Sequence, residues 1–153
     1  MVSGNYFLSA DQIEEEWARD CIIDKTRLTD ESLKIPQLHS KYIKWWRLAR
    51  REARSKAGEL KRLKLDKTEF YTQGPSNEHR HRGWQMVPKG ALKKTDASAY
   101  VEADPDVLAL VDELGAADDT VKLLESILET INKRSFHINN ALGTEKFLNG
   151  LDR

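Results

Sequence analysis

The chain has 153 residues, 33% of which are charged, and its 25 basic and 25 acidic side chains balance to a formal net charge of zero. This length is typical of one domain, or of a helical unit that completes its core by assembly. The single cysteine, Cys21, excludes an intrachain disulfide. With neither a secretory signal pattern nor an apolar run of roughly 20 residues, we expect an intracellular protein that does not enter membranes.

The first predicted helix covers about Ala10 to Asp20. Ser9 followed by Gln12 resembles a capping box, and Ile13 and Trp17 then lie one helical turn apart. The next residues, CIIDKTRLTDESLKIP, mix a short β-branched run with turn formers. We expect extended or irregular backbone there.

A second helix, of roughly 35 residues, is predicted from Pro36 to about Tyr71. At about 100° per residue, one arc of this helix is apolar and forms the predicted packing face: Leu38, Tyr42, Trp45, Trp46, Ala49, Ala53, Leu60 and Leu63. Lys56 points toward this apolar side, and Gly58 weakens the helix. A bend or break near residues 56–58 is therefore expected.

Basic side chains occupy a separate arc of roughly 120° on the same helix: Lys44, Arg47, Arg50, Arg51, Arg54, Lys61 and Arg62. Residues 39–94 carry sixteen basic and five acidic groups, against four and eight in residues 1–38 and five and twelve in residues 95–153. A basic block between acidic flanks suggests a polyanionic partner. Simple solvation of helix faces, or charge pairing between subunits, is the alternative.

Aromatic residues near the basic arc raise the question of base stacking. Trp45 and Trp46 lie on the apolar arc, which favours a place in the core. Tyr71 and Trp84 are the better stacking candidates, although each is also compatible with a packing role.

Residues 74–103 are rich in Gly, Pro, Ser and charge, and we interpret them as a flexible linker. The HRHR run at His79 to Arg82 lacks the carboxylate or thiolate neighbours of a typical metal site, so no metal is expected. Phosphate loops, dinucleotide fingerprints, paired cysteines and HExxH are absent from the sequence. We expect neither an enzyme nor a cofactor.

The third predicted helix begins with Asp104 as cap and Pro105 in its first turn. Its apolar residues repeat in steps of three and four, with Ser135 as the one polar position, which indicates heptad packing between helices. The predicted oligomerisation residues are Leu110, Leu114, Val121, Leu124, Leu128, Ile131 and Ile138. The predicted fold is one all-α domain, an elongated protomer with two long helices that assembles into a homo-oligomer.

The order of four segments resembles the UvsY family of recombination mediators from tailed bacteriophages. These segments are IIDKTRLTDESLKIPQLHSKYIKWW, LKRLKLDKTEFYTQG, VEADPDVLALVDEL and LLESILETINKRSFHINNALGTEKFLNG. The similarity runs from Ile13 to Leu151, and the HRHRGWQMVPKG insertion is its least regular part.

This resemblance implies a non-enzymatic protein of the infected bacterial cytoplasm that forms a ring-like homo-oligomer and binds single-stranded DNA. It implies that the protein loads a RecA-like recombinase in place of the phage single-strand-binding protein, during phage recombination, repair and recombination-dependent replication. The family's DNA-binding segment corresponds here to Lys61, Arg62, Lys64, Lys67 and Tyr71.

Two other functions stay open from the sequence. The first is a helical structural or assembly protein whose basic segment pairs with acidic segments of neighbouring subunits, which would make its assembly sensitive to salt. The second is a regulator that prefers double-stranded DNA, although no helix-turn-helix context supports it.

Overall fold

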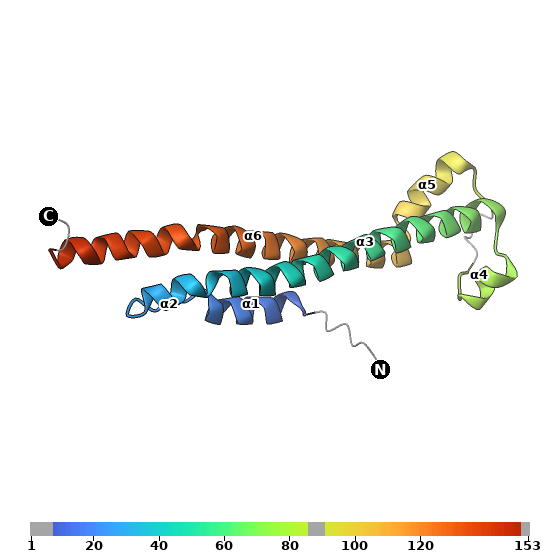
Figure 1. The fold of residues 1–153 in the computed structure, drawn as a ribbon. Helices are drawn as coiled ribbons and strands as arrows, with labels where there is room; N and C mark the ends of the chain where they lie inside the picture. The colour runs from blue at the N-terminus through green and yellow to red at the C-terminus, as the bar shows by residue number, and fades with distance from the viewer. Residues whose placement is uncertain (1–7, 86–90, 151–153) are drawn as a thin grey trace, which may run out of the picture. The chain divides into compact units, whose positions relative to one another are not determined.

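The computed structural model describes residues 8–85 and 91–150, and every regular element within them is an α-helix. The helices are α1 (Ala10–Asp20), α2 (Leu28–Leu33), α3 (Ile35–Gln73), α4 (Asn77–His81), α5 (Lys94–Glu102) and α6 (Pro105–Leu148) (Figure 1). The predicted all-α class is confirmed. None of the helices in these two ranges carries an apolar stretch long enough to cross a membrane.

The chain divides into two compact units, and the two long helices α3 and α6 each contribute to both. Unit 1 is formed by residues 8–51 and 118–150, and unit 2 by residues 52–85 and 91–117. Helix α3 is continuous through Gly58, so of the two expected alternatives for residues 56–58, a bend or a break, the break is wrong.

Side-chain caps fix the beginnings of α1 and α6. The Ser9 hydroxyl accepts a hydrogen bond from the Gln12 amide at 3.3 Å, and the Gln12 side chain accepts one from the Ser9 amide at 2.9 Å. At the start of α6, Asp104 Oδ1 accepts from the amides of Asp106 at 2.9 Å and Val107 at 3.3 Å. Both caps predicted from the sequence are confirmed, because each satisfies amides that a helix leaves unpaired.

The core of unit 1 lies between α1, the first part of α3 and the second part of α6 (Figure 1). Ile13, Tyr42 and Leu124 come from these three helices, and each is at most 1% exposed. Trp45 and Trp46 pack half-buried against this core, and the Trp45 ring meets Tyr42 edge to face at 5.1 Å. The interpretation of both tryptophans as packing residues is therefore confirmed.

The apolar seam of α6 packs within the chain. Leu124, Leu128, Ile131 and Ile138 are buried, and Leu110, Leu114 and Val121 are half-buried. The four buried residues pack against their own chain, whereas the three half-buried ones keep part of their surface exposed, and the role of this seam in joining subunits stays a prediction. The polar position also differs: Arg134 is buried and Ser135 is exposed, because a heptad repeat drifts by about 20° per seven residues on a straight helix.

Arg134 ties α6 to the connection between α1 and α2. Its guanidinium donates to the carbonyls of Asp20 at 3.0 Å and Ile22 at 3.2 Å, and it pairs with the buried Glu31 of α2 at 2.9 Å. The predicted irregular segment therefore contains a short helix. A helix of six residues is too short to be stable alone, so its stability comes from tertiary contacts. For this reason the local sequence gives little sign of it.

Unit 2 contains two short helices in the segment predicted as a linker. Helix α4 begins with a capping box in which Ser76 and His79 exchange hydrogen bonds of 3.1 and 3.2 Å. The Leu92 amide donates to the Tyr71 carbonyl at 2.9 Å, and Ala97 and Val101 of α5 are buried. These helices differ from the predicted flexible linker. Hydrogen bonds hold part of this segment, and the spacing of apolar residues in the sequence does not reveal such contacts.

Removal of apolar volume at Leu124 tests the core of unit 1. Leu124→Ala is expected to lower the free energy of unfolding by about 3 kcal/mol, because the side chain is fully buried. Asn132→Ala, at an exposed residue of α6 in the same unit, should change it by less than about 0.5 kcal/mol. Urea denaturation followed by circular dichroism measures both, and equal effects would contradict the assignment.

Candidate nucleic-acid interface

The basic residues of α3 fall into two groups according to their partners. Lys41, Lys56, Lys64 and Lys67 form ion pairs with carboxylates. Arg50 stands apart, because it has no ion pair in the part of the chain that the structure describes and lies over the Trp46 ring. A second group is exposed and has neither an acidic partner at ion-pair distance nor a ring beneath the cation within residues 8–85 and 91–150: Lys44, Arg47, Arg51, Arg54, Lys61 and Arg62. We call this second group the unpaired cations.

In unit 1 the unpaired cations are Lys44, Arg47 and Arg51, which are spaced by three and four residues. This spacing places them on one face of the helix in successive turns. Arg50 lies beside them, with its guanidinium 4.9 Å from the centre of the Trp46 ring. The Trp46 indole in turn donates to Glu125 of α6 at 3.2 Å, which holds the ring beneath Arg50.

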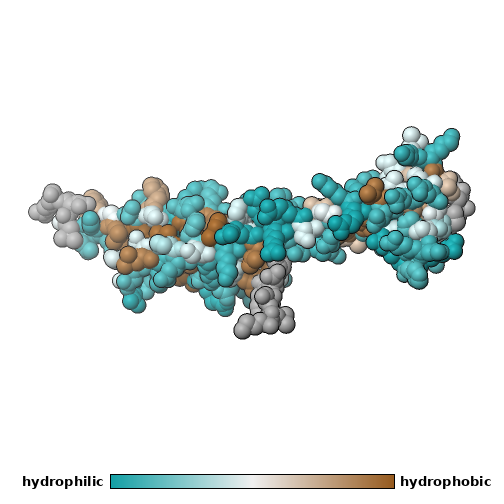
Figure 2. All heavy atoms as spheres, turned by 45° about the vertical axis from the view of Figure 1, so that its right-hand side comes forward, coloured by the Kyte–Doolittle hydropathy of each residue, from teal (hydrophilic) through white to brown (hydrophobic). Residues whose placement is uncertain are grey.

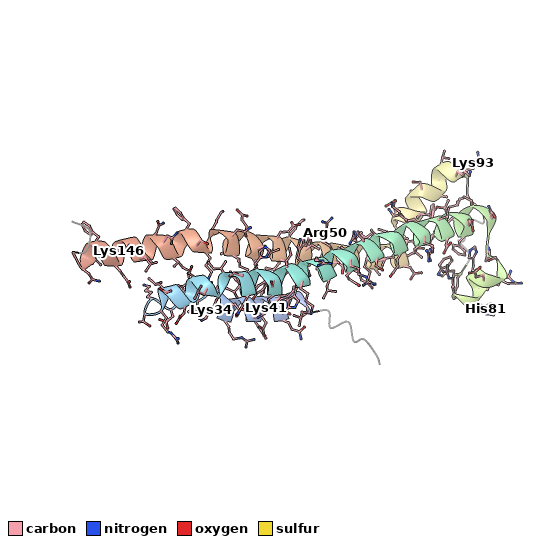
Figure 3. The ribbon with its side chains drawn as sticks, in the orientation of Figure 1. Lys34, Lys41, Arg50, His81, Lys93 and Lys146 are labelled. Carbon is pink, nitrogen blue, oxygen red and sulfur yellow. The ribbon has the colours of Figure 1, made fainter. Side chains whose placement is uncertain are left out.

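Lys41 lies on the part of α3 that α1 covers (Figure 3). Its ammonium contacts Glu16 and Asp20 of α1, each at 2.7 Å. The Tyr42 hydroxyl also donates to Asp20, at 2.9 Å. This lysine therefore serves the packing of α1 on α3, and its charge is neutralised within unit 1.

In unit 2 the unpaired cations are Arg54, Lys61 and Arg62. Two other lysines of α3 reach carboxylates of the same unit: Lys56 contacts Glu113 at 2.8 Å and Lys64 contacts Glu102 at 3.0 Å. The hydrogen bond to Glu113 raises the pKa of Lys56. Both pairs are at least partly exposed, so each stabilises the unit only weakly.

Lys67 is the buried member of the series, with 3% of its surface exposed. Its ammonium contacts Asp104 at 3.1 Å and Asp106 at 2.8 Å, and the Tyr71 hydroxyl donates to Asp104 at 2.7 Å. Burial alone would raise the pKa of Asp104, but the hydrogen bonds from Tyr71 and Lys67 outweigh it and lower the pKa. The four residues form one closed polar network, which we call the Asp104 network.

The Trp84 indole lies against the Lys67 end of the Asp104 network. The Lys67 ammonium lies 3.9 Å from the centre of the Trp84 ring, and His79 stacks on the same indole at 5.2 Å. Phe70 meets both rings edge to face, each at 5.6 Å. Cations and rings of the chain itself already contact this indole, so Trp84 is a packing anchor here and not a free stacking platform.

Comparison with known proteins decides the family of the chain. Residues 16–151 match the family model described as recombination, repair and ssDNA binding protein UvsY. The chain belongs to the UvsY family. Searches of the curated proteins and of the solved structures gave no significant match. Membership of UvsY connects this helical chain with recombination, repair and the binding of single-stranded DNA.

The UvsY resemblance pointed to five residues as DNA contacts, and the structure places them in different surroundings. Lys61 and Arg62 are exposed and unpaired, as a phosphate contact requires. Lys64 is half-buried in its pair with Glu102. Lys67 is buried and Tyr71 half-buried in the Asp104 network, where both serve the packing of unit 2, and their direct contact with DNA stays a prediction.

The sequence did not indicate which carboxylates of unit 2 pair with lysines of α3: Glu102, Asp104, Asp106 and Glu113. The positions of two lysines around the helix did indicate that they need carboxylate partners. At about 100° per residue Lys67 and Tyr71 fall within the apolar arc of α3, as Lys56 does, and a lysine on a packing face needs a carboxylate partner. No cluster of three His, Cys, Asp or Glu in the described ranges is arranged to hold a metal ion.

Acid should weaken unit 2 through the Asp104 network. Because the pKa of Asp104 is lowered on folding, its ionised form stabilises the fold above about pH 4, and this contribution is lost as the pH falls through the lowered value. Asp104→Asn should cost about 2 kcal/mol at pH 7 and progressively less below pH 4. Denaturation across a pH series measures this, with the exposed Asp112→Asn as control; a cost that does not depend on pH would contradict the network.

Proposed function

We propose that the chain is a recombination mediator that binds single-stranded DNA through the unpaired cations of α3. It assists the loading of a RecA-like recombinase in place of the phage single-strand-binding protein, in phage recombination, repair and recombination-dependent replication. The host cytoplasm is the expected place of action. The observation that supports this proposal best is the division of the basic residues of α3, because folding neutralises one group and leaves the other exposed.

The unpaired cations suit a phosphate backbone. Lys44, Arg47 and Arg51 are separated by about 4.5 and 6 Å along the axis of α3. Cations in such a row replace condensed counterions on DNA, so affinity falls steeply with salt and carries little sequence information. Binding that is indifferent to sequence is what a mediator needs, because recombination can begin at any exposed strand.

The proposed division of labour leaves ATP chemistry to the recombinase, since the sequence has no phosphate-binding loop. Each protomer offers a modest number of phosphate contacts. A homo-oligomer raises their effective concentration on one strand, so that the assembly binds more tightly than a protomer. We therefore keep assembly, ring-like in the UvsY resemblance, as part of the proposed function.

Exposed apolar residues of unit 1 are further candidates for assembly, because four of the seven predicted seam residues of α6 are buried within the chain. Phe136, Phe147 and Leu148 of α6 are 64%, 76% and 75% exposed, and Ile22 and Leu33 are 69% and 72% exposed. Figure 2 shows hydrophobic side chains among hydrophilic ones at the end of unit 1 that α2 and α6 form. Large apolar side chains exposed at one end of a compact unit are typical of protein interfaces.

Pairing of basic with acidic segments between subunits is less well supported. Lys56, Lys64 and Lys67 find their carboxylates inside unit 2 of the same chain. The cations that remain are those without such partners, and a polyanion from outside the chain would complement them.

Removal of the unpaired cations should reduce the salt dependence of DNA binding. Arg47→Ala with Arg51→Ala, and Lys61→Ala with Arg62→Ala, are each expected to lower the slope of log affinity against log salt by about 1 to 2, because each pair meets up to two phosphates. Fluorescence anisotropy with single-stranded oligonucleotides measures the slope. The same variants should slow the assembly of a RecA-like recombinase, followed by its ATPase, on DNA covered by single-strand-binding protein.

The matched control is Lys122→Ala with Lys146→Ala, which removes the same charge from exposed residues of α6. Its slope should stay close to that of the wild type. If all three variants changed the slope equally, net charge and not the face of α3 would govern binding. If the wild type did not bind single strands, or preferred duplex DNA, the proposed function would be wrong.

Apolar-to-polar changes at the exposed end of α6 should lower the mass of the assembly. Phe136→Ser with Phe147→Ser is expected to shift the protein toward smaller species while circular dichroism stays unchanged, because both side chains are more than half exposed in the chain. Light scattering measures the mass. Leu65→Ser, at an exposed leucine of unit 2, is the control, and an unchanged mass in the double variant would remove these phenylalanines from the interface.

A further inference from the structure

Leu65 is an exposed leucine on the basic side of α3. It is 62% exposed, whereas its neighbours Leu60 and Leu63 are half-buried on the apolar arc. At about 100° per residue Leu65 falls within the arc of the unpaired cations, far from the packing face. Packing within unit 2 therefore gives no reason for an apolar side chain at this position.

Lys61 and Arg62 precede Leu65 by four and three residues, which places all three on one face of the helix in adjacent turns. The charged residues beside Leu65 in the sequence are already engaged, Lys64 with Glu102 at 3.0 Å and Asp66 with Arg82 at 2.9 Å. Glu69 lies one turn beyond Leu65 and is exposed. The surface around Leu65 is thus cationic on the side of Lys61 and Arg62, and Glu69 bounds it on the other.

We propose that Leu65 contacts a nucleobase of the single strand whose phosphates lie on Lys61 and Arg62. The inference rests on the proposed function and adds to it a contact that phosphates cannot supply. An unstacked base offers an apolar face within reach of a side chain next to the backbone, whereas duplex bases are stacked on each other and hide their faces. Leu65 therefore favours single-stranded over double-stranded DNA, without sequence preference.

The charged surroundings distinguish Leu65 from other exposed apolar residues of unit 2. Leu108 and Val111 of α6 are 52% and 42% exposed, and Asp112 follows Leu108 by one turn. A carboxylate at that distance repels phosphates, so Leu108 is unsuited to the same contact. It offers a matched control, because Leu108→Gln removes an exposed leucine of the same unit from an acidic surface.

The test measures full-length wild type, Leu65→Gln, Leu65→Phe and Leu108→Gln on three labelled DNAs across a salt series. The DNAs are oligo(dT), an abasic strand of equal length and a duplex. Leu65→Gln should weaken binding to oligo(dT) by about threefold to tenfold with no change in salt slope, because it removes apolar contact and not charge. Leu65→Phe should bind oligo(dT) at least as tightly as wild type, because a ring also stacks on a base.

Affinity for the abasic strand should be the same for wild type and both Leu65 variants, since that strand keeps its phosphates and lacks bases. Leu108→Gln should match wild type on all three DNAs. Equal losses for Leu65→Gln on oligo(dT) and on the abasic strand would overturn the base contact, as would no loss on either. If wild type bound no single strand at all, the proposed function itself would fail, which is a different result from a neutral Leu65 variant.

Discussion

The contact between Lys67 and Asp104 is the constraint on which the rest of unit 2 depends. The Asp104 carboxylate caps α6, accepts a hydrogen bond from the Tyr71 hydroxyl and neutralises Lys67, which is almost fully buried. Loss of Asp104 would leave the buried Lys67 with Asp106 as its remaining carboxylate. Loss of Lys67 would leave the Asp104 carboxylate with the Tyr71 hydroxyl but without its cation, in a site beside Trp84. Because this contact fixes which side of α3 faces the N-terminal end of α6, it also turns Lys61, Arg62 and Leu65 toward solvent.

Basic residues therefore serve two purposes on α3, and the position of each one around the helix axis decides which purpose it serves. Lysines on the packing side join helices, as Lys41 joins α1 and Lys56 joins α6. Arginines and lysines on the other side keep their charge available for a polyanion. The net charge of zero hides this separation, because the acidic residues are concentrated in the flanking segments.

The sequence predicts the parts of this fold that rest on local signals. The bounds of α1, the long α3 and the cap of α6 follow from capping residues and apolar periodicity. Helices α2, α4 and α5 were missed, because six, five and nine residues gain little stability from their own turns and depend on contacts with distant residues. The carboxylate partners of Lys67 and Lys56 depend on how α3 and α6 are aligned with each other. The residue pattern of one helix does not carry this information. The α6 seam shows the same limit, since a heptad pattern does not say whether its partner is another helix of the chain or another chain.

The pairing of Arg50 with Trp46 has an optical consequence. Indole emission responds to charge and water near the ring, and here a guanidinium lies 4.9 Å above an indole whose nitrogen is held by Glu125. A phosphate that drew Arg50 away would change the surroundings of that ring while Trp17 and Trp45 remain packed around Tyr42. The chain thus carries an intrinsic fluorophore beside its unpaired cations, and a strand bound at the proposed site would change its emission without a label.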